Sequence, residues 1–438
     1  KKSRKTMTMS SLLRPEHTTD GRARAAALDD RHRPDVEPAS MVSYLSHGRV
    51  LVIGDEEAAL DAARHLDSEL VPTLVVPSTD APSSGMLDGL TVVRGPDPRL
   101  DGSLGNFTIR FAESDETPAA PKLVTQARFD LVLDVSKVPL LSREVPPPGY
   151  YATRREAQAL EAALAELPDM RGEFEKPKYF NYDPNICAHG RRGVRGCTRC
   201  LDACPASAIT SIGERISVDP NVCQGFGSCA TVCPTGAITY AFPSTGDLLG
   251  YLRQTLVRYR DGDGSDPVLM IYDRASADIA RTVASLPENE LPLELEEIGS
   301  LGMDAWLCCL AWGVRRVLIL AGPDTPASIR DVLARETALA GTLLDAMGYP
   351  GAAVRLCDSS DVAAAAGQLD EWMQMERAAK FAPAPEKQVL FRLAMDDLLE
   401  NAPHPRQTGA LPAGAPVGQV QGDGGACTLG LRCVAVCP

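Results

Sequence analysis

The hydrophobic positions of the chain form two regions in which short apolar runs alternate with helically spaced segments. In the first region the predicted elements are strands at 49–54, 73–77, 107–111 and 129–134 and a helix at 55–66. Strands that alternate with helices favour a parallel sheet covered by helices. We therefore predict an open α/β domain over residues 47–145.

The second region has the same alternation and lies in the C-terminal half. Its predicted elements are helices at 247–259, 275–284, 302–312 and 329–347 and strands at 268–272, 291–295, 316–320 and 353–356. Apolar runs of this length suit strands that are buried on both faces. The pattern predicts a second, small α/β domain over residues 244–380.

Three further segments have no strand pattern. Residues 1–46 are rich in charged residues, Ser, Thr and Pro without apolar periodicity, which predicts a mostly disordered leader. Residues 146–178 open with Pro-Pro-Pro-Gly and are predicted to form a linker with a helix at about 153–167. We interpret residues 381–426 as a helix followed by a linker.

Composition and charge narrow the class of protein. The 438 residues include 44% hydrophobic residues, which is enough for several cores, and carry a net charge of −14. This acidic balance argues against nucleic acid and anionic membranes as partners. No apolar stretch reaches the roughly 18 residues of a membrane span, and no signal-peptide pattern opens the chain. We expect a cytoplasmic protein without membrane insertion.

The cysteines carry the clearest chemical signal. Seven of them lie between residues 187 and 233, and the last of each run is followed by proline, in Cys204-Pro205 and Cys233-Pro234. Zinc and disulfides are the alternatives to iron–sulfur clusters. Only Cys197 and Cys200 form the C-x2-C pair typical of zinc sites, and neither alternative explains C-x3-C-P twice. Soft thiolates in this spacing favour iron–sulfur clusters.

This pattern resembles that of the bacterial two-cluster ferredoxins, C-x2-C-x2-C-x3-C-P repeated twice. The resemblance covers about residues 179–243, and both prolines are followed by x-x-Ala-Ile. It implies a ferredoxin-like α+β module. The sequence departs from the family at two positions: nine residues instead of two follow Cys187, and Phe226 stands where a second cysteine is expected.

In that family the fourth cysteine of each run binds the cluster of the other run. The resemblance therefore assigns one cluster to a four-cysteine site, composed of Cys187, Cys197, Cys200 and Cys233. It assigns the other to a three-cysteine site, composed of Cys204, Cys223 and Cys229. We expect a [4Fe-4S] cluster at the first site. The second is expected to hold a [3Fe-4S] cluster, or a [4Fe-4S] cluster with a fourth ligand other than cysteine.

The last twelve residues repeat the incomplete second run, with Cys427, Cys433 and Cys437-Pro438 in a C-x5-C-x3-C-P spacing and Gly430 at the missing position. We interpret residues 427–438 as the start of a second ferredoxin motif that is truncated here, with a further cluster in the complete module. The alternative is a genuine C-terminus with three spare thiols.

The turn after the first predicted strand bears on nucleotide binding. A dinucleotide fold places G-x-G-x-x-G there, whereas this chain has Gly54 followed by Asp55, Glu56 and Glu57. Carboxylates at a helix N-terminus occupy the position of a bound anion and repel phosphate. We interpret residues 47–145 as a degenerate, structural Rossmann-like domain, with bound nucleotide or flavin as the alternative.

The remaining candidate residues are arginines and cysteines outside the two runs. Four arginines lie in or beside the insertion after Cys187, where they could raise a cluster potential, bind an acidic partner or simply face solvent: Arg191, Arg192, Arg195 and Arg199. Cys308 and Cys309 lie in an apolar helical segment and are predicted to pack in a core. No hydrolytic or group-transfer motif is present, so we predict no catalytic residue.

The second α/β domain also resembles a known family. Residues 266–358 are similar, in the order of their elements and in segments 312–320 and 343–348, to the delta subunit family of methyl-viologen-reducing hydrogenases. That family carries a two-iron cluster on cysteines near two strands. The corresponding segments here, 272–275 and 321–323, contain no cysteine, so we expect this cluster to be absent.

The overall order of domains resembles that of iron–sulfur proteins associated with molybdenum-dependent formate dehydrogenases. The resemblance implies a non-catalytic subunit that relays single electrons to redox partner proteins. One alternative is a heterodisulfide-reductase or hydrogenase-like subunit with FAD in the first α/β domain. Others are an oxidoreductase that presents an open cluster iron to its substrate, and a regulator that senses oxygen or redox state through its cluster.

Overall fold

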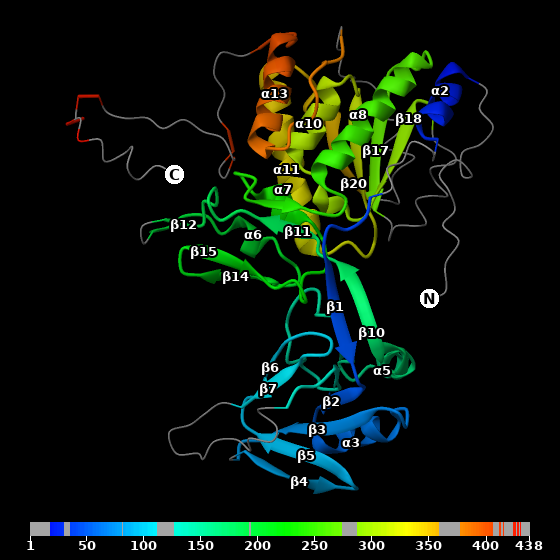
Figure 1. Ribbon diagram of the computed structural model, residues 1–438, viewed down its shortest axis with the longest axis vertical. Coiled ribbons are helices and arrows are strands. Elements are labelled where there is room, and N and C mark those ends of the chain that lie inside the picture. The colour runs from blue at the N-terminus through cyan, green and yellow to red at the C-terminus, as the bar shows by residue number, and fades with distance from the viewer. Residues whose placement is uncertain are drawn as a thin grey trace.

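The computed structural model describes residues 18–29, 36–80, 82–111, 127–191, 194–273, 287–358 and 377–405, together with short pieces between 411 and 430. The chain has mixed α/β architecture. A lower body, a central module and an upper body follow one another along the long axis of the molecule (Figure 1).

The lower body is built on a six-stranded sheet. Its strands, in spatial order, are β4 (Ser83–Leu87), β5 (Leu90–Gly95), β3 (Val71–Pro77), β2 (Arg49–Ile53), β8 (Leu131–Asp134) and β9 (Tyr150–Ala152). Every neighbouring pair except β4 and β5 is parallel. Helix α3 (Glu56–Arg64) packs on this sheet through Ala59 and Ala62. The strands and the helix expected around the first turn are therefore present.

The expected strand at 107–111 lies outside that sheet. It is shortened to β7 (Thr108–Arg110), which pairs antiparallel with β6 (Arg99–Asp101). Phe107 and Ile109 are nevertheless fully buried against the sheet. The apolar pattern therefore predicted correctly that these residues are buried. It did not predict that the strand pairs with β6 instead of joining the six-stranded sheet.

The segment at 146–178 contributes more than a linker. It supplies β9, helix α5 (Ala157–Glu166) and a 3₁₀ turn (Leu167–Met170), and Ala163 and Leu167 complete the lower core. It also supplies β10 (Gly172–Pro177), which pairs antiparallel with β1 (Met41–Ser46). These two strands form a ribbon that joins the lower body to the rest of the molecule (Figure 1).

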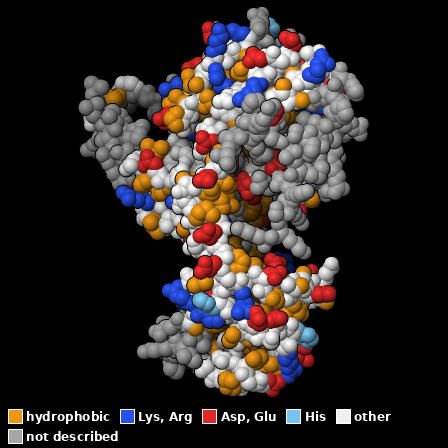
Figure 2. All heavy atoms as spheres, turned by 45° about the vertical axis from the view of Figure 1, so that its right-hand side comes forward, with side chains coloured by type: hydrophobic (Ala, Val, Ile, Leu, Met, Phe, Trp, Pro, Cys, Tyr) orange, Lys and Arg blue, Asp and Glu red, His pale blue; other side chains and the backbone are white. Residues whose placement is uncertain are grey.

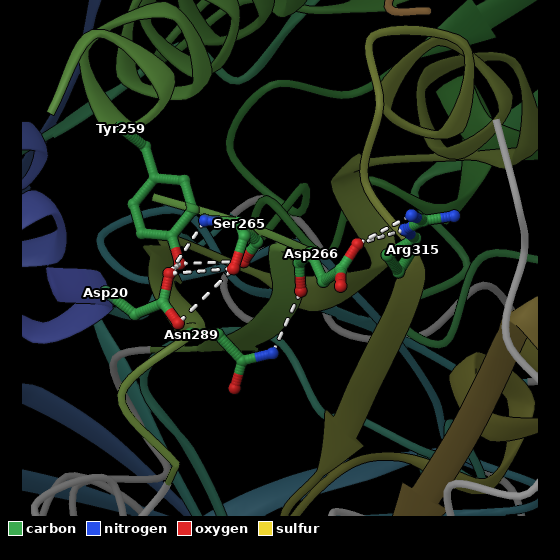
Figure 3. A network of polar contacts seen from close by, with 6 residues as sticks. All are labelled: Asp20, Tyr259, Ser265, Asp266, Asn289 and Arg315. Carbon is green, nitrogen blue, oxygen red and sulfur yellow. Dashed lines mark hydrogen bonds and ion pairs between the residues drawn. The ribbon is translucent and has the colours of Figure 1, made fainter. Parts of the chain in front are cut away.

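The expected disordered leader differs most from the structure. Besides β1, residues 1–46 contain helix α2 (Thr19–Ala27), which packs against the upper body; residues 1–17 and 30–35 lie outside the described residues. Asp20 accepts hydrogen bonds from the Tyr259 hydroxyl (2.9 Å) and the Ser265 N–H (2.7 Å), as Figure 3 shows. Ala23 and Ala27 of the same helix are buried in the upper core. The short side chains of two alanines and a hydrogen bond over some 240 positions give only a weak signal in the sequence.

The upper body is a four-stranded parallel sheet in the order β18 (Glu290–Leu295), β17 (Val268–Asp273), β19 (Arg316–Ala321) and β20 (Val354–Asp358). Its helices are α8 (Thr245–Asp261), α10 (Met303–Ala311), α11 (Ala327–Met347) and α13 (Lys387–Glu400). The helix expected at 275–284 lies outside the described residues. Neither α11 nor any other helix in the described ranges is long and apolar enough to cross a membrane.

Helix α10 forms the centre of the upper core. Trp306 and Cys308 are fully buried there, as is Cys309 next to them, and burial raises the pKa of Cys309 to about 12. A buried thiol of this kind is neutral and behaves as a small apolar side chain. These two cysteines take part in core packing.

The central module contains the seven cysteines. Strand β11 (Phe180–Tyr182) pairs with β16 (Ile238–Tyr240), and β14 (Ile209–Ile212) pairs with β15 (Arg215–Val218). Two short helices, α6 (Arg199–Asp202) and α7 (Ser228–Val232), complete it. The module lies beneath α11 and α13 of the upper body (Figure 1), and the molecule narrows below it, where hydrophobic and acidic side chains are exposed (Figure 2).

Candidate iron–sulfur centres

Each short helix of the central module presents one cysteine and is followed by another. Cys200 lies in α6 and Cys204 follows it, whereas Cys229 lies in α7 and Cys233 caps the end of that helix. A proline after each final cysteine keeps the helix from continuing, since it lacks an N–H donor. The thiols are thereby directed into the core of the module, around Ile209, Ile216 and Ile238.

The four-cysteine site surrounds one cavity. Cys187, Cys197, Cys200 and Cys233 all line it. Burial, followed by the nearby thiols of Cys233, Cys197 and Cys187, raises the pKa of Cys200 to about 12. The structure thus brings Cys233 of the second run together with three cysteines of the first, which is the crossover that the ferredoxin resemblance implies. Their role as iron ligands stays a prediction.

The three-cysteine site gathers around α7. Burial raises the pKa of Cys229 well above its usual value, and the nearby Cys223, Cys204 and Cys200 raise it further, in that order. The Ala208 N–H donates to the Cys204 sulfur at 3.4 Å. Because Cys200 belongs to the four-cysteine site, its influence on Cys229 shows that the two sites are neighbours.

The position where a fourth cysteine was expected is closed by the upper body. Phe226 packs against the upper core, and its carbonyl oxygen lies 2.4 Å from where a Cβ at Gly299 would sit. Gly227 has a positive φ of 76°, and a Cβ there would lie 2.4 Å from the Ser300 Cα. The loop that carries Phe226 is therefore pressed against the 3₁₀ turn at Ile298–Ser300.

Hydrogen bonds and a lysine favour negative charge at Cys233. Burial by itself would raise the pKa of this thiol, but the Ile238 N–H, the Thr235 side chain and N–H, and the Lys387 ammonium leave it below the usual value. Groups that stabilise a thiolate also stabilise the negative charge of a cluster bound to it. The four-cysteine site is thus suited to an anionic cluster.

A second lysine, Lys176, lies at the three-cysteine site, as Lys387 does at the four-cysteine site. Its ammonium donates to the carbonyl oxygens of Cys223 (2.5 Å) and Asn221 (3.2 Å) and lies 5.1 Å from the centre of the Tyr44 ring. The Tyr44 hydroxyl donates to the same Asn221 carbonyl at 2.7 Å. Sequence reasoning missed both residues, because they reach the site only through the pairing of β1 with β10.

The insertion after Cys187 contributes a histidine that the motif analysis did not single out. His189 is 1% exposed; its Nδ1 lies 2.7 Å from the Cys197 carbonyl oxygen and its Nε2 lies 2.8 Å from the Ser211 hydroxyl. Of the four arginines in or beside this insertion, Arg199 lines the four-cysteine cavity. Arg192 and the side chains of Arg191 and Arg195 lie outside the described part of the chain.

Of the three C-terminal cysteines predicted to begin a second ferredoxin motif, only Cys427 belongs to the described residues. Cys427 is exposed, and Cys433 and Cys437 lie outside the described residues. Within the described ranges, no group of three or more His, Cys, Asp or Glu side chains is arranged to hold a single metal ion. The fit to iron–sulfur clusters rests on the grouped thiols and on the N–H groups directed at their sulfur atoms.

At the N-terminus of α3, an aspartate of the chain itself occupies the position of a bound anion. The Asp55 carboxylate accepts a hydrogen bond from the Ala58 N–H at 3.1 Å and forms an ion pair with Arg155. A Cβ at Gly54 would lie only 2.7 Å from a Val135 methyl group, so the turn is closely packed. The positive end of the helix is therefore satisfied by the chain itself.

Comparison with known proteins identifies the central module. Residues 195–237 match the family of 4Fe-4S dicluster domains, and every cysteine of the two sites except Cys187 lies in this range. A search of curated proteins finds no relative of the chain. The chain therefore carries a ferredoxin-type iron–sulfur domain that supports at least one [4Fe-4S] cluster and, in general terms, electron transfer.

Proposed function

We propose that this protein is an electron-transfer subunit that relays single electrons through two unequal clusters. The four-cysteine site would hold a [4Fe-4S] cluster and the three-cysteine site a [3Fe-4S] cluster. The observation that carries the proposal is the grouping of the thiols: four line one cavity, and three others gather beside it. Iron–sulfur clusters bound by thiolates exchange one electron at a time, and their potentials depend on cluster type and surroundings.

The surroundings of Phe226 favour a relay over catalysis at an open iron. An enzyme of that kind needs space at the uncoordinated iron for its substrate. Here the loop with Phe226 and Gly227 is packed against Gly299 and Ser300. A relay needs only that neighbouring clusters be close and graded in potential, and the influence of Cys200 on Cys229 supports such closeness.

We further propose that the protein works in a cytoplasmic redox complex, with a formate dehydrogenase system as the first choice. The resemblance in domain order supports this assignment. The alternative, a heterodisulfide-reductase or hydrogenase-like subunit with FAD in the lower body, is less well supported. There the Asp55 carboxylate and its ion pair with Arg155 occupy the helix end that would receive a phosphate.

The proposal is tested by anaerobic reconstitution of the full chain, an iron count, and electron paramagnetic resonance (EPR) of oxidised and dithionite-reduced samples. We expect about seven irons in the two sites, with a [3Fe-4S] signal in the oxidised sample and a [4Fe-4S] signal in the reduced one. Two [4Fe-4S] signals would reinstate the open-iron alternative. A protein that takes up no iron would overturn the proposal.

A further inference from the structure

A cavity of about 360 Å³ is lined by residues of the central module and of α10, α11 and α13 of the upper body. Its size falls within the roughly 300–1,000 Å³ of small-molecule sites. Nothing in the relay proposed above requires it, because a relay passes electrons without binding a small molecule. The cavity therefore calls for a separate account.

The cavity shares a wall with the four-cysteine site. Cys233, Pro234 and Arg199 line both the large cavity and the cavity that the four thiols surround. A molecule held in the large cavity would be separated from a cluster at that site by little more than these residues. This closeness suits an exchange of electrons between the two.

One part of the large cavity is apolar. Met303 of α10, Leu343 of α11, and Phe391 and Met395 of α13 line it. An aromatic side chain together with flexible thioethers packs well against a planar ring, since methionine adapts its shape and makes favourable sulfur–aromatic contacts. This part of the cavity fits a conjugated ring system.

Another part is lined by charged residues of both signs, among them Lys387, Asp304 and Arg392. The Lys387 ammonium donates to the carbonyl oxygens of Ala230 (2.8 Å) and Thr231 (2.6 Å) and lies 3.6 Å from the Asp304 carboxylate. Arg392, which is exposed, also lines the cavity. Guanidinium and ammonium groups donate hydrogen bonds to carbonyl oxygens and to acidic groups of a ligand.

Glu336 provides a carboxyl group in the same cavity. Burial is the main cause that raises its pKa, with Asp304 acting in the same direction, whereas Lys387, Arg199 and Arg335 oppose the shift. A carboxyl group that holds its proton more strongly can donate a hydrogen bond to a carbonyl oxygen of a ligand.

We propose that this cavity, bounded by Cys233, Lys387 and Met395, binds a small quinone-class compound that exchanges electrons with the cluster of the four-cysteine site. The inference rests on the proposed electron-transfer function and adds a ligand to it. Reduction of the quinone would consume two protons from water and two electrons, supplied one at a time by the cluster that the four cysteines would hold. Both C=O bonds would become C–O–H, and a one-electron redox protein, the class of partner proposed above, would reduce the cluster again.

The test uses the full, iron-loaded chain and two probes, menadione and 1,4-naphthoquinone-2-sulfonate, with binding measured by calorimetry. Met395→Trp would fill the cavity, and we expect it to weaken binding of both probes by at least about tenfold. Leu399→Trp makes the same kind of change one turn further along α13, at a side chain that is 53% exposed and outside the cavity. This control should bind like the wild type.

Arg392→Ala distinguishes the charged part of the cavity from the apolar part. It should weaken the sulfonate by about tenfold and leave menadione nearly unchanged, because only the sulfonate carries an anion. In a parallel measurement, the wild type is reduced with dithionite, freed of excess dithionite and mixed with menadione, and it should form the hydroquinone as its cluster is reoxidised. The Met395→Trp variant should do so more slowly.

An iron-loaded protein that binds neither probe saturably would overturn this inference and leave the relay intact. Equal weakening by Met395→Trp and Leu399→Trp would overturn it as well, since binding would then lie elsewhere. If the reconstituted wild-type protein takes up no iron, the proposed electron-transfer function is overturned, and the electron exchange with the quinone is overturned with it. Iron content and EPR signals, recorded for every variant, separate these outcomes.

Discussion

The two cysteine sites differ in how they meet the upper body. The four-cysteine site borders an open cavity through Cys233 and is accompanied by Lys387 of α13. The three-cysteine site is covered where Phe226 and Gly227 press against Gly299 and Ser300, and its lysine, Lys176, comes from the β1–β10 ribbon. One half of the module thus faces space for a small molecule, whereas the other is packed against protein.

This difference shows how a repeated motif acquires two roles. Both halves have a short helix and a C-x3-C-P sequence, and each site has a lysine nearby: Lys176 donates to the Cys223 carbonyl oxygen, and Lys387 lowers the pKa of Cys233. They differ in the insertion after Cys187, in Phe226, which stands where the first run has Cys197, and in the element packed beside each. The predictions below test whether the halves are as independent as this comparison implies.

Loss of a thiol from the four-cysteine site should have the largest effect. Cys200→Ala removes a predicted ligand whose thiol lies near those of Cys233, Cys197 and Cys187. We expect the reduced-state [4Fe-4S] signal to vanish and bound iron to fall by about four atoms per chain. Cys309→Ala, in the upper core, is the control and should retain the iron. Retention of the full iron content by Cys200→Ala would contradict the assignment.

A cysteine at position 226 should remove the difference in the number of thiols between the two sites. Phe226→Cys supplies the missing thiol of the three-cysteine site, so the oxidised-state [3Fe-4S] signal should be replaced by a second reduced-state [4Fe-4S] signal. Phe226→Leu is the matched control, because it retains an apolar side chain against the upper core without adding a ligand. If both variants behave alike, the effect comes from packing and not from ligation.

Ionisation of Glu297 should weaken the packing of the upper body against the three-cysteine site and leave the four-cysteine site unchanged. Burial, followed by the nearby Asp273 and Glu296 carboxylates, raises the pKa of Glu297 to about 8. Between about pH 4.5 and about pH 8 the folded state binds more protons than the unfolded state, so stability falls as the pH rises through this window. Glu297 directly precedes the turn at Ile298–Ser300, so its charge should disturb the contact with Gly227.

We expect Glu297→Gln to recover about 2 kcal/mol in urea unfolding at about pH 9, and roughly half of that at about pH 6. Glu173→Gln, at an exposed position of β10, should leave the pH dependence unchanged. The EPR signal of the three-cysteine site should vary with pH in the wild type, while that of the other site stays constant. Equal pH dependence of both signals would contradict the comparison.

Two lysine substitutions should give the smallest and most selective effects. Lys176→Met should lower the potential of the cluster at the three-cysteine site by about 50 mV, equivalent to about 1 kcal/mol, because a nearby cation stabilises the reduced state. Lys387→Met should do the same at the four-cysteine site. Each variant is the control for the other in an EPR-monitored redox titration. A shift of both potentials in either variant would show that the sites are not independent.

Much of the fold was predictable from the sequence where local patterns determine structure. The apolar runs at β2, β17 and β19 were found as strands because they are buried on both faces. The pattern could not reveal that α2 docks on the upper body or that the linker supplies β9. Those elements are held by hydrogen bonds and pairings between residues far apart in the chain, such as Asp20 with Tyr259.

The same division holds at the cysteine sites. By itself, the sequence determined which thiols belong to a ferredoxin-type module, since short spacings and Cys-Pro pairs act through local turns. Only the tertiary structure decided what surrounds them: Lys176 through the pairing of β10, Lys387 through the packing of α13, and the covered loop at Phe226. Local geometry places the thiols, whereas charge, access and packing come from segments brought close only by folding.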